Sequence, residues 1–146
     1  MNSDTPSTPA MTDMPRRWPH GILGAIGRGL RGKCPACGEG RLFRAYLKVA
    51  DNCPACGEEL HHHRADDFPA YLVIIITGHI LVPIVLAVET EIVPPIWLSV
   101  TLWPTLAFAT ALALLQPVKG AVVAVQWFGG LHGFEAARNA RQAAAR

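Results

Sequence analysis

Two long runs without a charged residue limit what this chain can fold into. The first extends from Phe68 to Val88 and the second from Ile96 to Leu115. About 20 residues of helix, rising 1.5 Å per residue, cross the ~30 Å hydrocarbon layer of a membrane. The short segment between the runs, residues 89–95, holds two glutamates and ends in two prolines. The sequence therefore predicts a membrane α-helical hairpin of two transmembrane helices, 68–88 and 96–115.

The first half of the chain has a different character. Of the 146 residues 51% are hydrophobic and 16% charged, which excludes an intrinsically disordered protein as a whole. Residues 1–15 are rich in Ser, Thr, Pro and Asp, so we expect a disordered tail, and they lack the apolar run of a secretory signal. Residues 16–33 mix basic and apolar side chains, which is typical of a helix lying on an anionic membrane surface, although their glycines also allow a flexible basic linker.

All four cysteines lie in segment 34–60, in two copies of the motif CPACG. Cys34 and Cys37 form the first pair, and Cys53 and Cys56 form the second after fifteen intervening residues. Two residues between the cysteines of a pair let both sulfurs face one ion. The pattern predicts a small β unit, a four-cysteine zinc ribbon, whose closed ligand shell makes the site structural rather than catalytic.

Other uses of the four thiols fit less well. Disulfides need an oxidising compartment, and a redox CxxC needs only one pair within a thioredoxin-like surround. Iron in a four-sulfur site stays open, because the same ligands accept both metals.

Basic residues predict the orientation of the hairpin. Nine of the 13 Lys and Arg precede the first span, four follow the second, and segment 89–95 has none. Since positive charge favours the cytoplasmic side, we expect a multi-pass membrane protein with both termini in the cytoplasm.

Several polar residues near the spans are candidates for function. In the connector 61–67, His61, His62 and His63 are either solvated or ligands for a second metal ion or a lipid phosphate, and Asp66 and Asp67 are candidate caps for the helix that begins before Pro69. His79 lies at mid-span, where an ionisable group is costly, so it either contacts a metal, haem or quinone or donates a hydrogen bond between helices.

The C-terminal segment 117–146 is predicted to be separate from the second span. Pro117 is expected to end that helix, and residues 118–131 are too short to cross a membrane, so an amphipathic or re-entrant segment is expected, followed by an alanine-rich helical tail. Gln126 and His132 in this segment are candidate interfacial or intramembrane functional residues alongside His79.

The motifs CPACGEGRLFRAYLKVADNCPACGEEL, HHRADDFPAY and QPVKGAVVAVQWFGGLHGF together resemble the DUF983 family of small bacterial membrane proteins, over about residues 27–134. The resemblance implies a cytoplasmic zinc-ribbon-like segment attached to a transmembrane hairpin, and with it a location in the bacterial inner membrane. Family members have no established activity, and in several proteobacteria they are encoded among cytochrome c oxidase subunits and assembly factors. The positions that match the family pattern are Cys34, Cys37, Cys53, Cys56, Asp66, Asp67, Pro69, His79, Lys119, Gln126, His132 and Gly133.

Two hypotheses of function follow. The first is a non-enzymatic accessory or assembly factor, for which respiratory cytochrome c oxidase is the client suggested by the resemblance. It would contact membrane lipids and either a membrane-protein partner or a second copy of itself. The second is a metal- or cofactor-handling membrane protein that uses His79. Nucleic-acid binding is disfavoured, because acidic residues offset Arg41, Arg44 and Lys48 in the cysteine segment.

Overall fold

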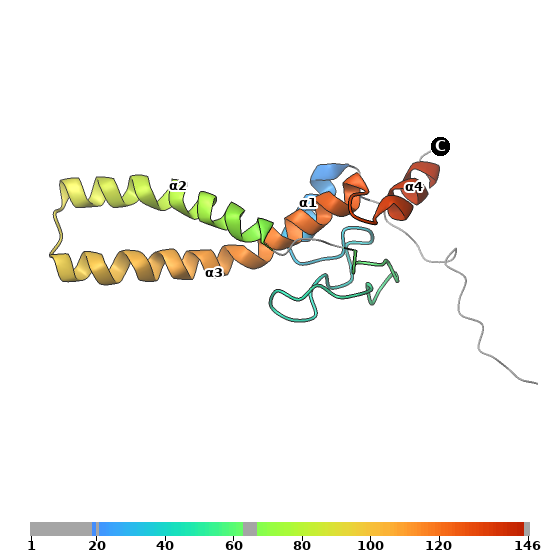
Figure 1. Cartoon of the computed structure of the whole chain (residues 1–146), viewed down its shortest axis with the longest axis horizontal. Helices are drawn as coiled ribbons and strands as arrows, with labels where there is room; N and C mark the ends of the chain where they lie inside the picture. Colours follow the sequence, from blue (N-terminus) through green and yellow to red (C-terminus); the bar gives the residue numbers. More distant parts are fainter. Residues whose placement is uncertain (1–18, 20, 63–66, 145–146) are drawn as a thin grey trace, which may run out of the picture.

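The computed structural model describes residue 19, residues 21–62 and residues 67–144. Helix α1 extends over Ile22–Leu30, α2 over Phe68–Glu91, α3 over Ile96–Gly129 and α4 over Glu135–Ala144. Figure 1 shows α2 and α3 side by side as a long hairpin, with α1, α4 and the cysteine segment gathered at one end of it. The expected tail 1–15, together with His63 and Asp66, lies outside the described residues.

Helices α2 and α3 are long and apolar enough to cross a membrane. The most apolar 18-residue stretches of the two helices have mean hydropathies of 2.5 and 1.8. Of these stretches, only 17% of the α2 residues and 0% of the α3 residues are buried within the protein. The apolar side chains of the hairpin therefore point mostly outward, unlike those of a core helix in a soluble domain.

The prediction that Pro117 ends the second span is wrong. Helix α3 contains both Pro104 and Pro117 and continues to Gly129, and in Figure 1 it changes direction where it leaves α2. Its 34 residues correspond to roughly 50 Å, well beyond the ~30 Å of a hydrocarbon layer. Residues 118–129 are therefore a helical extension of the second span and not a separate amphipathic or re-entrant segment.

The reason for the continuation is a buried stripe beyond the proline. Gly120, Val123, Ala124 and Trp127 are all buried, and their spacing of three and four residues places them on one face of a helix. Packing of that face offsets the backbone hydrogen bond that Pro117 removes.

The helix ends also differ from expectation. Asp67 occupies the N-cap position of α2, as predicted, but its side chain makes no capping hydrogen bond there. Helix α2 continues to Glu91, which places Glu89 inside the helix, where it accepts a hydrogen bond from Trp103 Nε1 at 2.8 Å. At the C-terminus of α3, Gly130 adopts a left-handed conformation and Leu131 N–H donates to Gln126 O at 2.9 Å, and the helix ends there.

The main hydrophobic core lies where α3 leaves the hairpin. Leu42 and Leu60 of the cysteine segment, Val123 and Trp127 of α3, and Phe134 before α4 are almost fully buried there. Helix α1 crosses α3 so closely that a Cβ on Gly29 would collide with the backbone carbonyl of Gly120. The helical interpretation of residues 22–30 therefore describes the structure better than a flexible linker does, and the buried side of α1 faces α3.

The cysteine segment forms turns rather than strands. Its three antiparallel bridges, Lys33 with Arg41, Phe43 with Val49 and Asn52 with Glu59, are isolated, and the described residues contain no β-strand. The predicted β ribbon is thus reduced to single bridges, and two of the three bridges enclose the tight turns that carry the cysteine pairs.

Candidate metal centre

The four cysteine sulfurs converge on one point. All four Sγ atoms lie within 4.8 Å of one another, with Cys34 3.9 Å from Cys56 and Cys37 3.8 Å from Cys53. Sulfurs placed 2.3 Å from a tetrahedral zinc ion are roughly 3.8 Å apart. The cluster therefore fits a single metal ion such as zinc, with one cysteine pair from each CPACG motif.

Each motif reaches this geometry through the same backbone turn. Gly38 N–H donates to Cys34 O at 2.8 Å, and Gly57 N–H donates to Cys53 O at 2.9 Å. Both glycines have positive φ, 76° and 71°, a conformation that costs a side-chain-bearing residue about 1 kcal/mol or more. The repeated CPACG sequence thus encodes two equivalent loops that hold two sulfurs each.

Electrostatic interactions in the cluster oppose the ionisation of all four thiols at once. The hydrogen bond between Cys34 and Cys56 raises the pKa of Cys34, helped by burial, and lowers the pKa of Cys56 to about 5. Burial raises the pKa of Cys53 to about 11. Four sulfurs this close cannot all be thiolates unless a positive ion offsets their charge, so metal binding and loss of the thiol protons are coupled.

Residues outside the motifs support the first loop and the second pair. The Arg28 guanidinium on α1 donates to Pro35 O at 3.1 Å and to Ala36 O at 2.9 Å, so α1 is hydrogen-bonded to the loop between Cys34 and Cys37. Gly40 lies against the second pair, where any side chain would collide with Cys53 Sγ. These contacts connect the metal centre to α1 and leave no room for a larger residue at Gly40.

A buried polar contact anchors the centre to α3. Trp127 is fully buried, and its Nε1 donates to Glu58 Oε1 at 3.0 Å, immediately after the second CPACG motif. The Arg141 guanidinium of α4 lies 4.9 Å from the centroid of the same indole ring and donates to Phe128 O. Burial lowers the pKa of Arg141, and the nearby Glu58 carboxylate counteracts this. A carboxylate, an indole and a guanidinium thus join the cysteine segment, α3 and α4.

A comparison with models of known protein families identifies the family of this chain. Residues 43–127, more than half of the chain, match the model of DUF983, described as a protein of unknown function. The chain belongs to the DUF983 family. The match includes the second cysteine pair and extends through α2 to Trp127, whereas the first pair precedes it. No curated protein and no solved structure matches the chain.

The structure brings two of the other predicted residues of this DUF983 protein together and leaves the third apart. Gln126 and His132 line an apolar cavity of about 630 Å³ between α1, the start of α2 and the extension of α3. His79 lies elsewhere, exposed on α2, with Nδ1 2.8 Å from Ile75 O of the preceding turn. A single site made of His79, Gln126 and His132 is therefore absent from the described residues.

Sequence reasoning missed the residues that connect the centre to the helices. Arg28, Glu58, Trp127 and Arg141 are not cysteines or histidines, and they lie far apart in the sequence, so spacing gives no hint of their contacts. One signal was present: the helical spacing of Gly120, Val123, Ala124 and Trp127 after Pro117 indicates a buried face.

Proposed function

We propose that this DUF983 protein is a membrane-anchored, zinc-binding accessory protein without catalytic activity of its own, and that its cysteine unit is a docking platform for a partner. The cysteine unit here means residues 34–60. The observation that carries the proposal is the buried connection between this unit and α3, through Trp127 and Glu58. A helix that extends beyond an apolar span and packs against a metal-binding unit can hold that unit, and a partner docked on it, beside the membrane.

The chemistry of the centre supports a structural role. Four cysteine ligands fill a tetrahedral shell, so zinc bound there would contribute folding free energy and leave no position for a reactive water. Residues 34–60 contain no helix or strand, so the unit has little stability from backbone pairing. Zinc is the expected ion because its four-thiolate sites are tetrahedral and redox-inert.

The distribution of charge supports insertion in the bacterial inner membrane with the cysteine unit in the cytoplasm. All Lys and Arg of the described residues lie before α2 or after position 118, whereas Glu89 and Glu91 lie at the opposite end of the hairpin. By the positive-inside rule, this distribution of charge favours a cytoplasmic location for the cysteine unit and both termini. The reducing cytoplasm keeps the thiols available for metal.

The hairpin offers a surface for a membrane partner. Its outward side chains include Ile74, Ile80, Val100 and Phe108, each at least 51% exposed. Lipids, a second copy or another membrane protein would cover this surface. As the client we propose respiratory cytochrome c oxidase during its assembly, on the basis of the family resemblance.

The proposal is tested by recording reduced-minus-oxidised haem spectra of membranes from a strain that lacks this chain. We expect the oxidase haem signal to fall, and to be restored by the wild-type chain but not by Cys34→Ser/Cys37→Ser. Asn52→Ser, a substitution at an exposed residue next to a ligand, is the matched control and should restore the signal. An unchanged spectrum in the deletion strain would rule out the oxidase as client, and full rescue by the cysteine variant would rule out the docking role of the metal unit.

A further inference from the structure

A second group of metal-binding side chains lies beside the cysteine unit. Glu59, His61 and His62 each present a ligand atom, and these atoms all lie within 4.8 Å of one another. His62 Nε2 is 3.0 Å from Glu59 Oε2. Two ligands bound 2.0–2.1 Å from a tetrahedral zinc ion are roughly 3.3 Å apart, so this pair needs only a small adjustment to share an ion.

The backbone fixes Glu59 and His61 on the same side of the chain. Leu60, between them, is fully buried, and the Asp51 carbonyl accepts hydrogen bonds from Leu60 N–H at 2.8 Å and from His61 N–H at 3.1 Å. Glu59 also pairs with Asn52 in an antiparallel bridge. Leu60 is buried in the core, whereas Glu59 before it and His61 after it are both exposed, so their side chains lie together on the surface.

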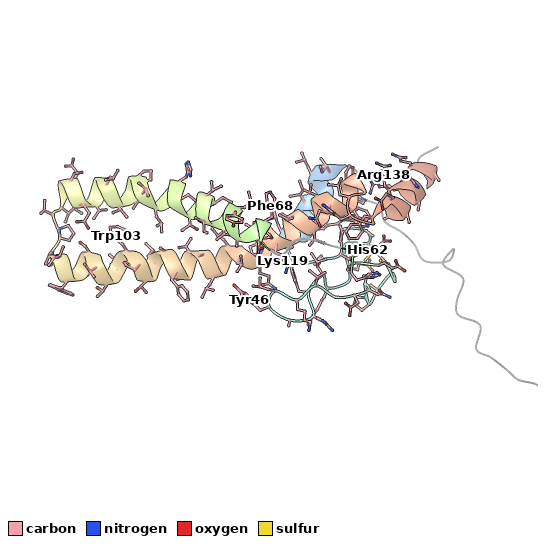
Figure 2. The ribbon with its side chains drawn as sticks, in the orientation of Figure 1. Tyr46, His62, Phe68, Trp103, Lys119 and Arg138 are labelled. Carbon is pink, nitrogen blue, oxygen red and sulfur yellow. The ribbon has the colours of Figure 1, made fainter. Side chains whose placement is uncertain are left out.

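His62 packs against the turn between α3 and α4, and this contact fixes the position of its ring. Its ring meets Phe134 edge-to-face, with centroids 5.7 Å apart at 80°, and lies 4.0 Å from the ring of His61. A Cβ at Gly133 would approach His62 Nδ1 to 2.9 Å, so glycine leaves the room that the imidazole occupies. Figure 2 shows His62 between the cysteine unit and this turn.

We propose that Glu59, His61 and His62 form a second metal site, for an exchangeable divalent ion of the zinc type. Two imidazoles and one carboxylate are typical ligands of zinc, and three protein ligands leave a position for water or for a ligand from a partner. The site borders a cavity of about 300 Å³, lined by Glu58, Glu59, His62 and Phe134 among others. Because its ligands are solvent-accessible and fewer, this site binds more weakly and exchanges faster than the four-cysteine centre.

The test is a titration of the detergent-solubilised full-length protein, purified with a tag that contains no histidine, with Co²⁺ and then Zn²⁺. We expect two ions per chain. The first gives intense thiolate charge-transfer bands, and the second gives only weak bands and is removed by a mild chelator. His62→Ala and Glu59→Gln should weaken the second event at least about tenfold and leave the thiolate bands unchanged. His132→Ala alters an exposed histidine outside the group and should retain both ions.

Two outcomes would overturn this proposal. One is a wild-type protein that binds a single ion with thiolate bands, and the other is a second ion that survives in the His61→Ala/His62→Ala variant. Thiolate bands in each variant show that the cysteine unit has folded, so loss of the second ion is distinguishable from misfolding. The same bands report on the four-cysteine centre independently, so failure of one site does not imply failure of the other.

Discussion

The two parts of α3 lie in different surroundings although they belong to one helix. In the part beside α2, large side chains such as Trp97 and Phe108 are each 67% exposed. In the part after Pro117, Val123, Ala124 and Trp127 are 0% exposed and pack against α1 and the cysteine unit. Apolar composition alone therefore does not indicate whether the side chains of a helix are buried in a protein core or exposed on its surface. Their burial depends on whether another part of the chain packs against the helix.

Loss of the metal ligands should have the largest effect on one region while sparing the other. Cys37→Ser/Cys53→Ser, or removal of the metal by a strong chelator, should unfold residues 34–60 while α2 and the first part of α3 stay helical. Four-thiolate zinc contributes on the order of 10 kcal/mol to such small units. Hydrogen–deuterium exchange measured by mass spectrometry should show fast exchange in 34–60 and unchanged protection in 70–88. Asn52→Ser is the control, and equal loss of protection in both regions would contradict the comparison.

A tryptophan from each part of α3 provides a matched pair of smaller effect. Trp127→Ala should cost about 3–5 kcal/mol of stability, because it opens a cavity and leaves the buried Glu58 without its indole partner. Trp97→Ala, at an exposed position of the same helix, should cost far less. The midpoint of urea unfolding in detergent, monitored by the susceptibility of the cysteine unit to proteolysis, measures the stability of both variants. Equal midpoints would show that the extension of α3 does not anchor the unit.

Two glycines of α1 provide a second matched pair of variants, with the smallest expected effect on stability. Gly29→Ala should separate α1 from α3 and cost about 1–3 kcal/mol, because its Cβ has no space beside Gly120. Gly27→Ala, which meets nothing within 4 Å, should be neutral or stabilise α1 by up to about 1 kcal/mol. Thermal unfolding monitored by circular dichroism measures the difference. The contact between α1 and α3 would be dispensable if both variants unfolded at the temperature of the wild type.

Features that depend on local pattern could be predicted from the amino-acid sequence alone. Two uncharged runs of membrane length predicted two long apolar helices, and the spacing of the CPACG motifs predicted four sulfurs around one point. Both follow from properties of short segments: hydropathy over one helix length, and the reach of two sulfurs separated by two residues. Family membership followed from the same motifs.

The helix bounds and buried contacts where distant segments meet depend on the tertiary structure. Pro117 lies within a continuous helix because Val123 and Trp127 gain more from packing against the cysteine unit than one lost hydrogen bond costs. Glu58 is buried because an indole 69 residues later in the chain donates to it. Asp67 heads α2 without capping it through its side chain. Such contacts depend on residues distant in the sequence, and local propensity carries no information about which of them will be neighbours.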